Sequence, residues 1–371
     1  MTTSHSTPRA VLALSAVVAL GALAFGCGDA DKITAVGSAA PAASTTPGTS
    51  AAPMADKAAP VPTTSAQAAK PEPAPAASGN GSGAAGVPYE RAALLAYLPT
   101  ECPDGRAYID VQKMLGGDGG AVKELIEALI AGTTKDKGQA EAVLAELRAG
   151  GLDPATSVRE IAACVLSGRK PLVAFGIDAS KAKDATQTLF AAISKGEGAD
   201  KVKLVDEGGL KVIKNPRGEL LAMVAPNVLV LAKTVDRLKE SAKSPGGTAG
   251  FAEAPAHVLW LRLTGKDHVD VSVANKGKDY ELIGLFPPTG PMIAKIKTDP
   301  KGTAEAYELQ AQMQAAQLAG SPFASLAAAV KAAQWSIEGE RMKVTAKAPK
   351  SVVVQSMKSA LENPEMLDGF R

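Results

Sequence analysis

Three residues in the second half of the chain, His268, Asp270 and Ser272, have the side-chain types of a hydrolase triad. In a strand these alternate positions share one face, and the valines between them share the other. A working triad places its imidazole between the acid and the nucleophile, which usually come from separate segments. The pattern therefore predicts a strand with one apolar and one solvated face, not a catalytic site.

Three other patterns could suggest chemistry. Ser180 and Lys183 fit S-x-x-K, but the companion S-D-N and K-T-G motifs are missing, and Asp178 and Ser180 are expected to start a helix. His257 begins a predicted strand, and a zinc site there would need further ligands that the sequence does not supply. The stretch "GGDGG" at 116–120 lacks the alternating carboxylates of a calcium loop and is expected to be a turn. We therefore expect no catalytic residue, cofactor or metal site.

The three cysteines, Cys27, Cys102 and Cys164, give a more specific signal. An odd number in an exported protein indicates that one thiol has a different role from the others. We expect Cys102 and Cys164 to form a disulfide, which closes a loop of about 60 residues and stabilises by roughly 4 kcal/mol in the chain-entropy model. The alternative is two separate buried thiols.

Cys27 follows a segment typical of an export signal. Arg9 precedes a run from Ala10 to Phe25 that is apolar but for one serine and a glycine, and that is short for a bilayer-spanning helix. The residues "ALA" at 22–24 fit cleavage by ordinary signal peptidase, which would leave an unpaired, exposed thiol in an oxidising compartment. Lipidation of Cys27 avoids that problem, and a retained membrane helix is the third alternative.

The stretch "LAFGC" at 23–27 resembles the lipobox of bacterial lipoproteins, whose cysteine thiol receives a diacylglyceryl group before cleavage on its N-terminal side. Gly26 and Cys27 match, whereas Leu23 lies one place too early and Phe25 is bulky. The resemblance covers about the first 90 residues and implies a mature chain beginning at Cys27. At least two acyl chains, palmitate among them, would give stable anchoring. By similarity to enterobacterial lipoproteins, Gly28 in place of aspartate favours the outer over the inner membrane.

The chain divides by composition. Residues 1–26 are the expected lipoprotein signal peptide, and 27–87 form an Ala/Pro/Ser-rich linker that cannot bury enough apolar surface to fold. We expect this linker to be disordered, including "GNGSG" at 79–83, which has no strand before it to form a phosphate loop. Two α+β units are expected to follow, over 88–245 and 251–371.

Periodicity and turn signals predict the elements of the two units. Expected helices cover 89–98, 122–130, 143–147, a short segment before 171, 180–193, a segment from 234, 323–330 and 351–362. Expected strands cover 106–111, 171–178, 201–205, 210–214, 219–224, 228–232, 257–265, two within 269–286 and two within 335–348. The fold class is α+β, with antiparallel meander sheets packed against helices and two similar units in tandem.

Composition limits the function classes. Aromatic residues make up only 4% and the net charge is +2, so the core must be largely aliphatic, with Trp260 and Trp335 inside it. The chain has neither the basic stripe nor the stacking aromatics of a nucleic-acid-binding protein. We therefore expect a lipid-anchored, non-catalytic binding module of the cell envelope, facing the periplasm or the cell surface, with a protein or apolar ligand as partner. The alternatives are a carrier of a lipid or other apolar ligand, an envelope hydrolase whose site is assembled from distant residues, and a purely structural component.

Overall fold

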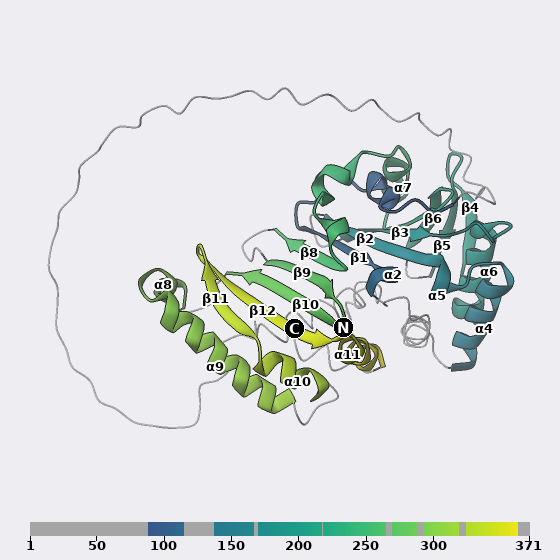
Figure 1. The fold of residues 1–371 in the computed structure, drawn as a ribbon. Coiled ribbons are helices and arrows are strands. Elements are labelled where there is room, and N and C mark those ends of the chain that lie inside the picture. Colours follow the sequence, from purple (N-terminus) through teal and green to yellow (C-terminus); the bar gives the residue numbers. More distant parts are fainter. Residues whose placement is uncertain are drawn as a thin grey trace, which may run out of the picture. The chain divides into compact units, whose positions relative to one another are not determined.

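The computed structural model describes residues 88–114, 137–166, 170–216, 218–264, 269–287, 292–318 and 324–362 (Figure 1). The expected signal peptide, Cys27 and the linker lie outside these residues, as do the helix expected over 122–130 and the stretch at 116–120. The described part is an α+β fold, as the sequence predicts.

Twelve strands of the described residues form one antiparallel sheet in the order β11-β12-β10-β9-β8-β1-β2-β3-β7-β6-β5-β4. Their bounds are β1 Gly105–Asp110, β2 Val158–Leu166, β3 Lys170–Ile177, β4 Lys203–Asp206, β5 Lys211–Lys214, β6 Leu220–Ala225, β7 Val228–Ala232, β8 Leu259–Leu263, β9 Val269–Lys276, β10 Asp279–Phe286, β11 Gln334–Glu338 and β12 Arg341–Pro349. The helical segments are η2 Ala93–Tyr97, α2 Val111–Met114, α4 Lys137–Ala149, α5 Pro154–Ser157, α6 Ala185–Glu197, α7 Val235–Ala242, η3 Gly247–Phe251, η4 Ala254–Ala256, α8 Met292–Thr298, α9 Pro300–Leu318, α10 Ala324–Lys331 and α11 Lys350–Glu362.

The strand order repeats outward from the central pair of β1 and β8. In each half three strands run away from the centre as a meander, β1-β2-β3 on one side and β8-β9-β10 on the other. Helices follow, and the last strand of each half returns to pair with the third, β7 with β3 and β12 with β10. The two similar units of the prediction are thus halves of one continuous sheet, and the β4–β5 hairpin is an addition to the first half.

One strand differs from the prediction. The sequence predicts a short helix before residue 171, but only the single turn α5 is helical, and Val158–Leu166 forms β2. Ala162, Ala163 and Cys164 are all fully buried, so consecutive residues on both faces are apolar. A strand buried on both faces shows no alternation, and short apolar runs of this kind cannot be told from helix by periodicity.

The helix predicted from Ser180 begins later, at Ala185, because a different residue caps it. The carboxylate of Asp184 accepts a hydrogen bond from the N–H of Gln187, which satisfies an amide of the first helical turn. Asp178 instead accepts hydrogen bonds from Ser180 and pairs with Arg159. These hydrogen bonds, that from Ser180 above all, lower the pKa of the Asp178 carboxyl.

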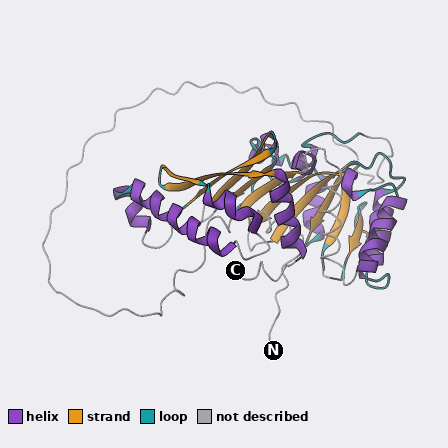
Figure 2. Cartoon of the chain, turned by 60° about the horizontal axis from the view of Figure 1, so that its bottom comes forward, coloured by secondary structure: helices purple, strands orange, loops and turns teal. Residues whose placement is uncertain are grey.

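The sheet has two faces that are covered differently. We call one the helix face, with Ile109, Leu261 and Val344 as examples; it packs against α6 in the first half and against α8, α9 and α11 in the second. We call the other the strap face, with Tyr108 and Trp260 as examples; its first half is covered by residues 88–104, η3 and α7. Figure 2 shows most of the helices on one side of the strands.

The two tryptophans lie in the core, as the composition predicts. Trp260 is buried on the strap face beside Phe251, with ring centroids 5.9 Å apart. Trp335 stacks on Tyr307 at 5.8 Å and meets Phe286 edge-on at 6.0 Å on the helix face. These aromatic contacts join α9 to β10 and β11, so the few aromatic residues are concentrated where helix and sheet meet.

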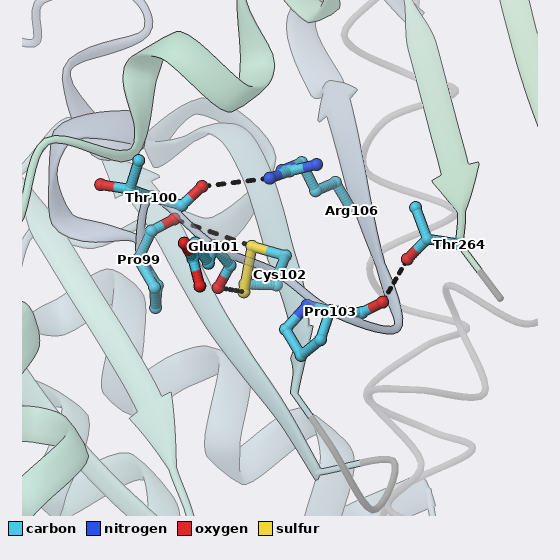
Figure 3. The surroundings of a disulfide bond; sticks show 8 residues. Pro99, Thr100, Glu101, Cys102, Pro103, Arg106 and Thr264 are labelled. Atoms are coloured by element: carbon cyan, nitrogen blue, oxygen red, sulfur yellow. Dashed lines mark hydrogen bonds between the residues drawn. A yellow bond between two sulfur atoms is a disulfide. The ribbon is translucent and has the colours of Figure 1, made fainter.

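The disulfide between Cys102 and Cys164 is present, as predicted, with the two Cα atoms 5.2 Å apart. Figure 3 shows its surroundings, where Arg106 of β1 donates a hydrogen bond to the Thr100 carbonyl at 3.0 Å and Thr264 donates one to the Pro103 carbonyl. The bond joins the chain just before β1 to β2, and so closes the loop that contains α2, α4 and α5.

We predict that replacing both disulfide cysteines with serine (Cys102→Ser, Cys164→Ser) lowers the free energy of unfolding by about 2–4 kcal/mol, because the unfolded chain loses a long closed loop. Urea denaturation followed by circular dichroism measures the change. A reductant should bring the unmodified protein to the stability of the variant and leave the variant unaffected. Equal midpoints for the oxidised protein and the variant would contradict the prediction.

Candidate functional site

Six polar side chains meet on the strap face where the N-terminal residues cross β1 and β2. We call this group the Glu160 cluster, and its members are Tyr89, Arg91, Tyr108, Asp110, Lys113 and Glu160. Asp110 and Glu160 are direct partners in the β1–β2 ladder, so both carboxylates project from the same face. Both are buried, with 4% and 2% of their surface exposed.

Glu160 is surrounded by hydrogen-bond donors. The Tyr108 hydroxyl donates to Oε1 at 2.5 Å, and the Tyr89 hydroxyl and the Ala92 N–H, the latter at 2.7 Å, donate to Oε2. The Nε of Arg91 lies 3.5 Å from Oε1. Burying an ionised carboxylate is costly unless it is paired and hydrogen-bonded, and here both oxygens are satisfied.

Asp110 is satisfied in the same way. Its Oδ1 accepts from the Lys113 N–H at 2.8 Å, and its Oδ2 lies 3.2 Å from Arg91 Nη2 and 3.7 Å from Lys113 Nζ. Both cations also donate to the carbonyl of Pro255, in η4. Two carboxylates therefore face two cations, and the cluster ties the N-terminal residues to β1, β2 and the segment before β8.

The electrostatics of the two tyrosines oppose acid–base chemistry at neutral pH. Burial raises the pKa of the Tyr89 hydroxyl, and its hydrogen bond to Glu160 raises it further. The same two causes, in the same order, raise the pKa of Tyr108. Both hydroxyls stay protonated as donors to Glu160, so the two tyrosines and the two buried carboxylates of the cluster are hydrogen-bonded or ion-paired within the chain.

Local backbone features allow this packing. Ala92 has a left-handed conformation, with φ of 62°, uncommon for a residue with a side chain, and its N–H points at Glu160. Gly176 on β3 leaves room for the ring of Tyr89, since a Cβ there would lie 2.2 Å from the tyrosine hydroxyl oxygen. The left-handed backbone of Ala92 and the absence of a side chain at Gly176 thus allow Tyr89 to lie beside Glu160.

A second surface, on the same face of the sheet, has a different character. We call it the open face, because no described helix covers it and none of its side chains is buried. It consists of alternate residues of β8 to β12, namely Arg262, Asp270, Ser272, Ala274, Glu281, Ile283, Leu285, Gln334, Ser336, Glu338, Arg341, Lys343, Thr345 and Lys347.

Ion pairs connect the strands of the open face. Asp270 accepts from Arg262 at 2.9 Å and from Arg341 at 2.8 Å, and Arg341 must cross β10 to reach it. Lys343 pairs with Glu338 at 2.7 Å. The polar strand face predicted from Asp270 and Ser272 is confirmed, since Val271 on the opposite face is buried; His268 lies outside the described residues.

Two other candidates from the sequence, His257 and Ser180, make hydrogen bonds within the chain. His257 follows η4, two residues before β8, and its backbone N–H donates to the carbonyl of Ala254 at 3.0 Å. Burial lowers its pKa, and Lys113 lowers it further, while Glu253 acts in the opposite direction. The Ser180 hydroxyl donates to Asp178 at 2.7 Å. Within the described ranges no group of three or more His, Cys, Asp or Glu residues is arranged to hold a metal ion.

Sequence reasoning missed the Glu160 cluster. Two carboxylates beside apolar runs are the signal that could have found it. Glu160 directly precedes "IAACVL", and Asp110 directly follows "AYI". A charged residue within a buried strand needs partners, but the sequence does not say which residues supply them. Tyr89 and Arg91 come from a segment that forms no strand, so no pairing pattern points to them.

Comparison with known proteins gives a similarity in structure only. No family model and no curated protein matches the chain. Crystal form I of TP0453 covers 75% of this chain and 98% of its own, with 9% identity and a TM-score of 0.40. Crystal forms III and IV give 8% identity, TM-scores of 0.41, and coverage of 71% and 75% of this chain and 97% and 98% of their own. Among the described residues, no helix is both long and apolar enough to span a membrane.

We predict that Glu160→Gln lowers the free energy of unfolding by about 2–4 kcal/mol, because an amide cannot accept from every donor and leaves buried polar groups unpaired. Urea denaturation at pH 7 measures the loss. The control Glu207→Gln removes the carboxylate of a partly exposed pair with Lys214, outside the buried network, and should have little effect. An equal loss in the two variants would show that the buried network contributes no more to the free energy of unfolding than the pair with Lys214 does.

We also predict a specific loss of stability in alkali. Above about pH 10 the unfolded chain releases tyrosine protons that Tyr89 and Tyr108 retain in the native state, so stability falls by about 1.4 kcal/mol per pH unit for each. Below that pH this contribution is fully present. The double variant Tyr89→Phe, Tyr108→Phe should show a shallower fall between pH 8 and 11. Tyr280, whose pKa burial raises to about 12, remains in both chains, and parallel curves would contradict the prediction.

Proposed function

We propose that this protein is a lipid-anchored component of the cell envelope whose α+β unit is a non-catalytic binding module. The anchor is Cys27, and the chain between it and residue 88 is a tether that holds the module away from the membrane surface. Support for an oxidising compartment comes from the Cys102–Cys164 disulfide, since such bonds persist mainly in exported proteins. The residue after the anchor, Gly28, favours the outer membrane.

The observation that carries the binding role is the unequal covering of the strap face. In the first half this face is apolar, with Leu172, Val212 and Val230 buried beneath η2, η3 and α7. In the second half the equivalent surface is the open face, and the helix that closes that half, α11, packs on the helix face instead. The open face therefore offers a broad, regular surface from five adjacent strands to a partner.

The cations of the open face favour one kind of partner. Arg341, Lys343 and Lys347 lie on the same face of β12, with Thr345 between the two lysines. The spacing along the strand is about 7 Å from Arg341 to Lys343 and about 13 Å from Lys343 to Lys347. Their carboxylate partners are solvent-exposed or half-buried, and such surface pairs contribute little to stability, so acidic groups of another protein can compete for the cations. The best-fitting partner is a protein with an acidic surface.

The non-catalytic part of the proposal is supported by the state of the Glu160 cluster. It contains the two buried carboxylates and the two tyrosines with raised pKa values, features that otherwise suggest catalysis. Each carboxylate is already engaged by donors from the chain itself. A site for chemistry needs a group left available to the substrate, and this cluster instead fastens one segment to another.

The anchor is tested by mass spectrometry of the N-terminal peptide of the protein purified gently from its native membrane. We predict a mass that corresponds to diacylglyceryl modification of Cys27, and loss of membrane attachment in Cys27→Ala. An unmodified N-terminus at residue 25 would instead establish ordinary signal-peptidase cleavage and would overturn the anchor.

The binding surface is tested by crosslinking in intact cells followed by mapping of the crosslinked residues. We predict crosslinks on β10 and β12, and at least a tenfold loss of the crosslinked protein in Lys343→Glu, Lys347→Glu. The control Lys301→Glu, Lys331→Glu places the same charge change on exposed lysines of α9 and α10 and should retain it. Equal loss in both variants would remove the open face as the site, and recovery of a bound acyl lipid in place of a protein would favour a carrier.

A further inference from the structure

We infer that residues 88–101 open and close on the sheet as a unit, and that the Cys102–Cys164 disulfide confines this opening so that β1 stays in place. We call residues 88–104 the strap. A role for this opening under a pull from the membrane rests on the proposed anchor at Cys27, because the proposed tether is continuous with the first residue of the strap.

The position of β1 makes confinement necessary. β1 is the first strand along the chain, yet it lies at the centre of the sheet, paired with β2 on one side and β8 on the other. The chain that enters it comes directly from the strap. If opening continued from the strap into β1, the strand would leave its neighbours and the two halves of the sheet would separate.

The strap itself takes part in no strand pairing, and the order of the twelve strands is complete without it. It is held by side-chain packing, by the bonds of Tyr89, Arg91 and Ala92 to the carboxylates of the Glu160 cluster, and by hydrogen bonds to loops. Leu94, Leu95 and Leu98 are fully buried against the strap face. Detaching residues 88–101 therefore breaks apolar contacts, loop hydrogen bonds and the bonds to the side chains of Glu160 and Asp110. It breaks no backbone pairing of the ladder, so the sheet can persist while these residues are released.

The contacts of the strap fall into two groups along the chain. The first group is the Glu160 cluster with a hydrogen bond from the Asn227 side chain to the Pro88 carbonyl at 3.1 Å. The second is the loop after α7, where the Gly246 and Gly247 N–H groups donate to the carbonyls of Ala96 and Leu98 at 3.0 and 3.1 Å. A pull from the tether acts on the Glu160 cluster first, because Tyr89 precedes every other strap contact except that of Pro88.

The disulfide lies where the strap ends and the sheet begins. In the β1–β2 register Cys164 is opposite Arg106, the second residue of β1, and the Asp104 N–H already donates to the Val165 carbonyl at 3.1 Å. Tension that reaches Cys102 passes through the covalent bond to β2. The disulfide thus fixes the end of β1 to its neighbour and leaves the preceding residues free to move.

Hydrogen–deuterium exchange of the full chain, followed by mass spectrometry, tests the inference with two independent variants. Glu160→Gln replaces one acceptor oxygen by an amino group that cannot accept, and Gly176→Ala places a methyl group where the Tyr89 hydroxyl lies. In each we expect amide exchange over 88–101 to rise at least tenfold, with exchange over 105–110 unchanged. Glu207→Gln, which changes a partly exposed carboxylate outside the Glu160 cluster, is the control and should change neither.

The role of the disulfide is tested by combining Glu160→Gln with Cys102→Ser and Cys164→Ser. We expect the faster exchange to extend through residues 105–110. Strap exchange that does not change in either single variant would overturn the inference, and so would an equal rise in the strap and in β1 with the disulfide intact. Failure here is distinct from failure of the anchor, because exchange is measured whether or not Cys27 carries lipid.

Discussion

The pairing of β1 with both β2 and β8 is the constraint on which the rest of the structure depends. Residues 105–109 pair with strands of both halves, so a single strand of six residues holds the halves together. β1 is buried on both faces, since its own Ile109 is buried in the core of the helix face and its Tyr108 in that of the strap face. A strand in this place must be apolar and protected, and the strap, the disulfide and the Glu160 cluster all act at its ends.

The same strand order in two halves produces two different surfaces because the covering segments differ. In the first half, α7 and the strap bury an apolar face; in the second, α11 packs on the helix face and leaves charged residues on the open face. The residue types agree with this difference. Val230 of the first half is apolar and fully buried, whereas Asp270 and Arg341 of the second half form an ion pair that is partly exposed to solvent. In our proposal, the buried strap face of the first half contributes to stability, and the open face of the second half binds a partner.

The Glu160 cluster illustrates how a buried charge can specify a position. Replacing a buried ion pair with apolar residues is often neutral for stability, so such groups are better understood as marking one arrangement among several. Apolar contacts of the strap leucines have no direction, whereas the hydrogen bonds from the Tyr89 hydroxyl and the Ala92 N–H to the Glu160 carboxylate require a defined geometry. The cluster sets where the chain enters the domain, and the disulfide sets where the strap ends.

The sequence by itself determined the features that depend on near neighbours along the chain. Alternation in "VDVSV", apolar runs bounded by turn residues such as "VLVLA" after Pro226-Asn227, and the helix start at Thr234 predicted most strands and helices, and the cysteine count predicted the disulfide. It did not reveal β2, whose residues are buried on both faces, nor the continuous sheet, since the β1–β8 pairing joins residues about 150 positions apart. Tertiary structure alone decided which donors surround Glu160 and which half of the strap face stays open, because burial by distant segments leaves no periodic trace.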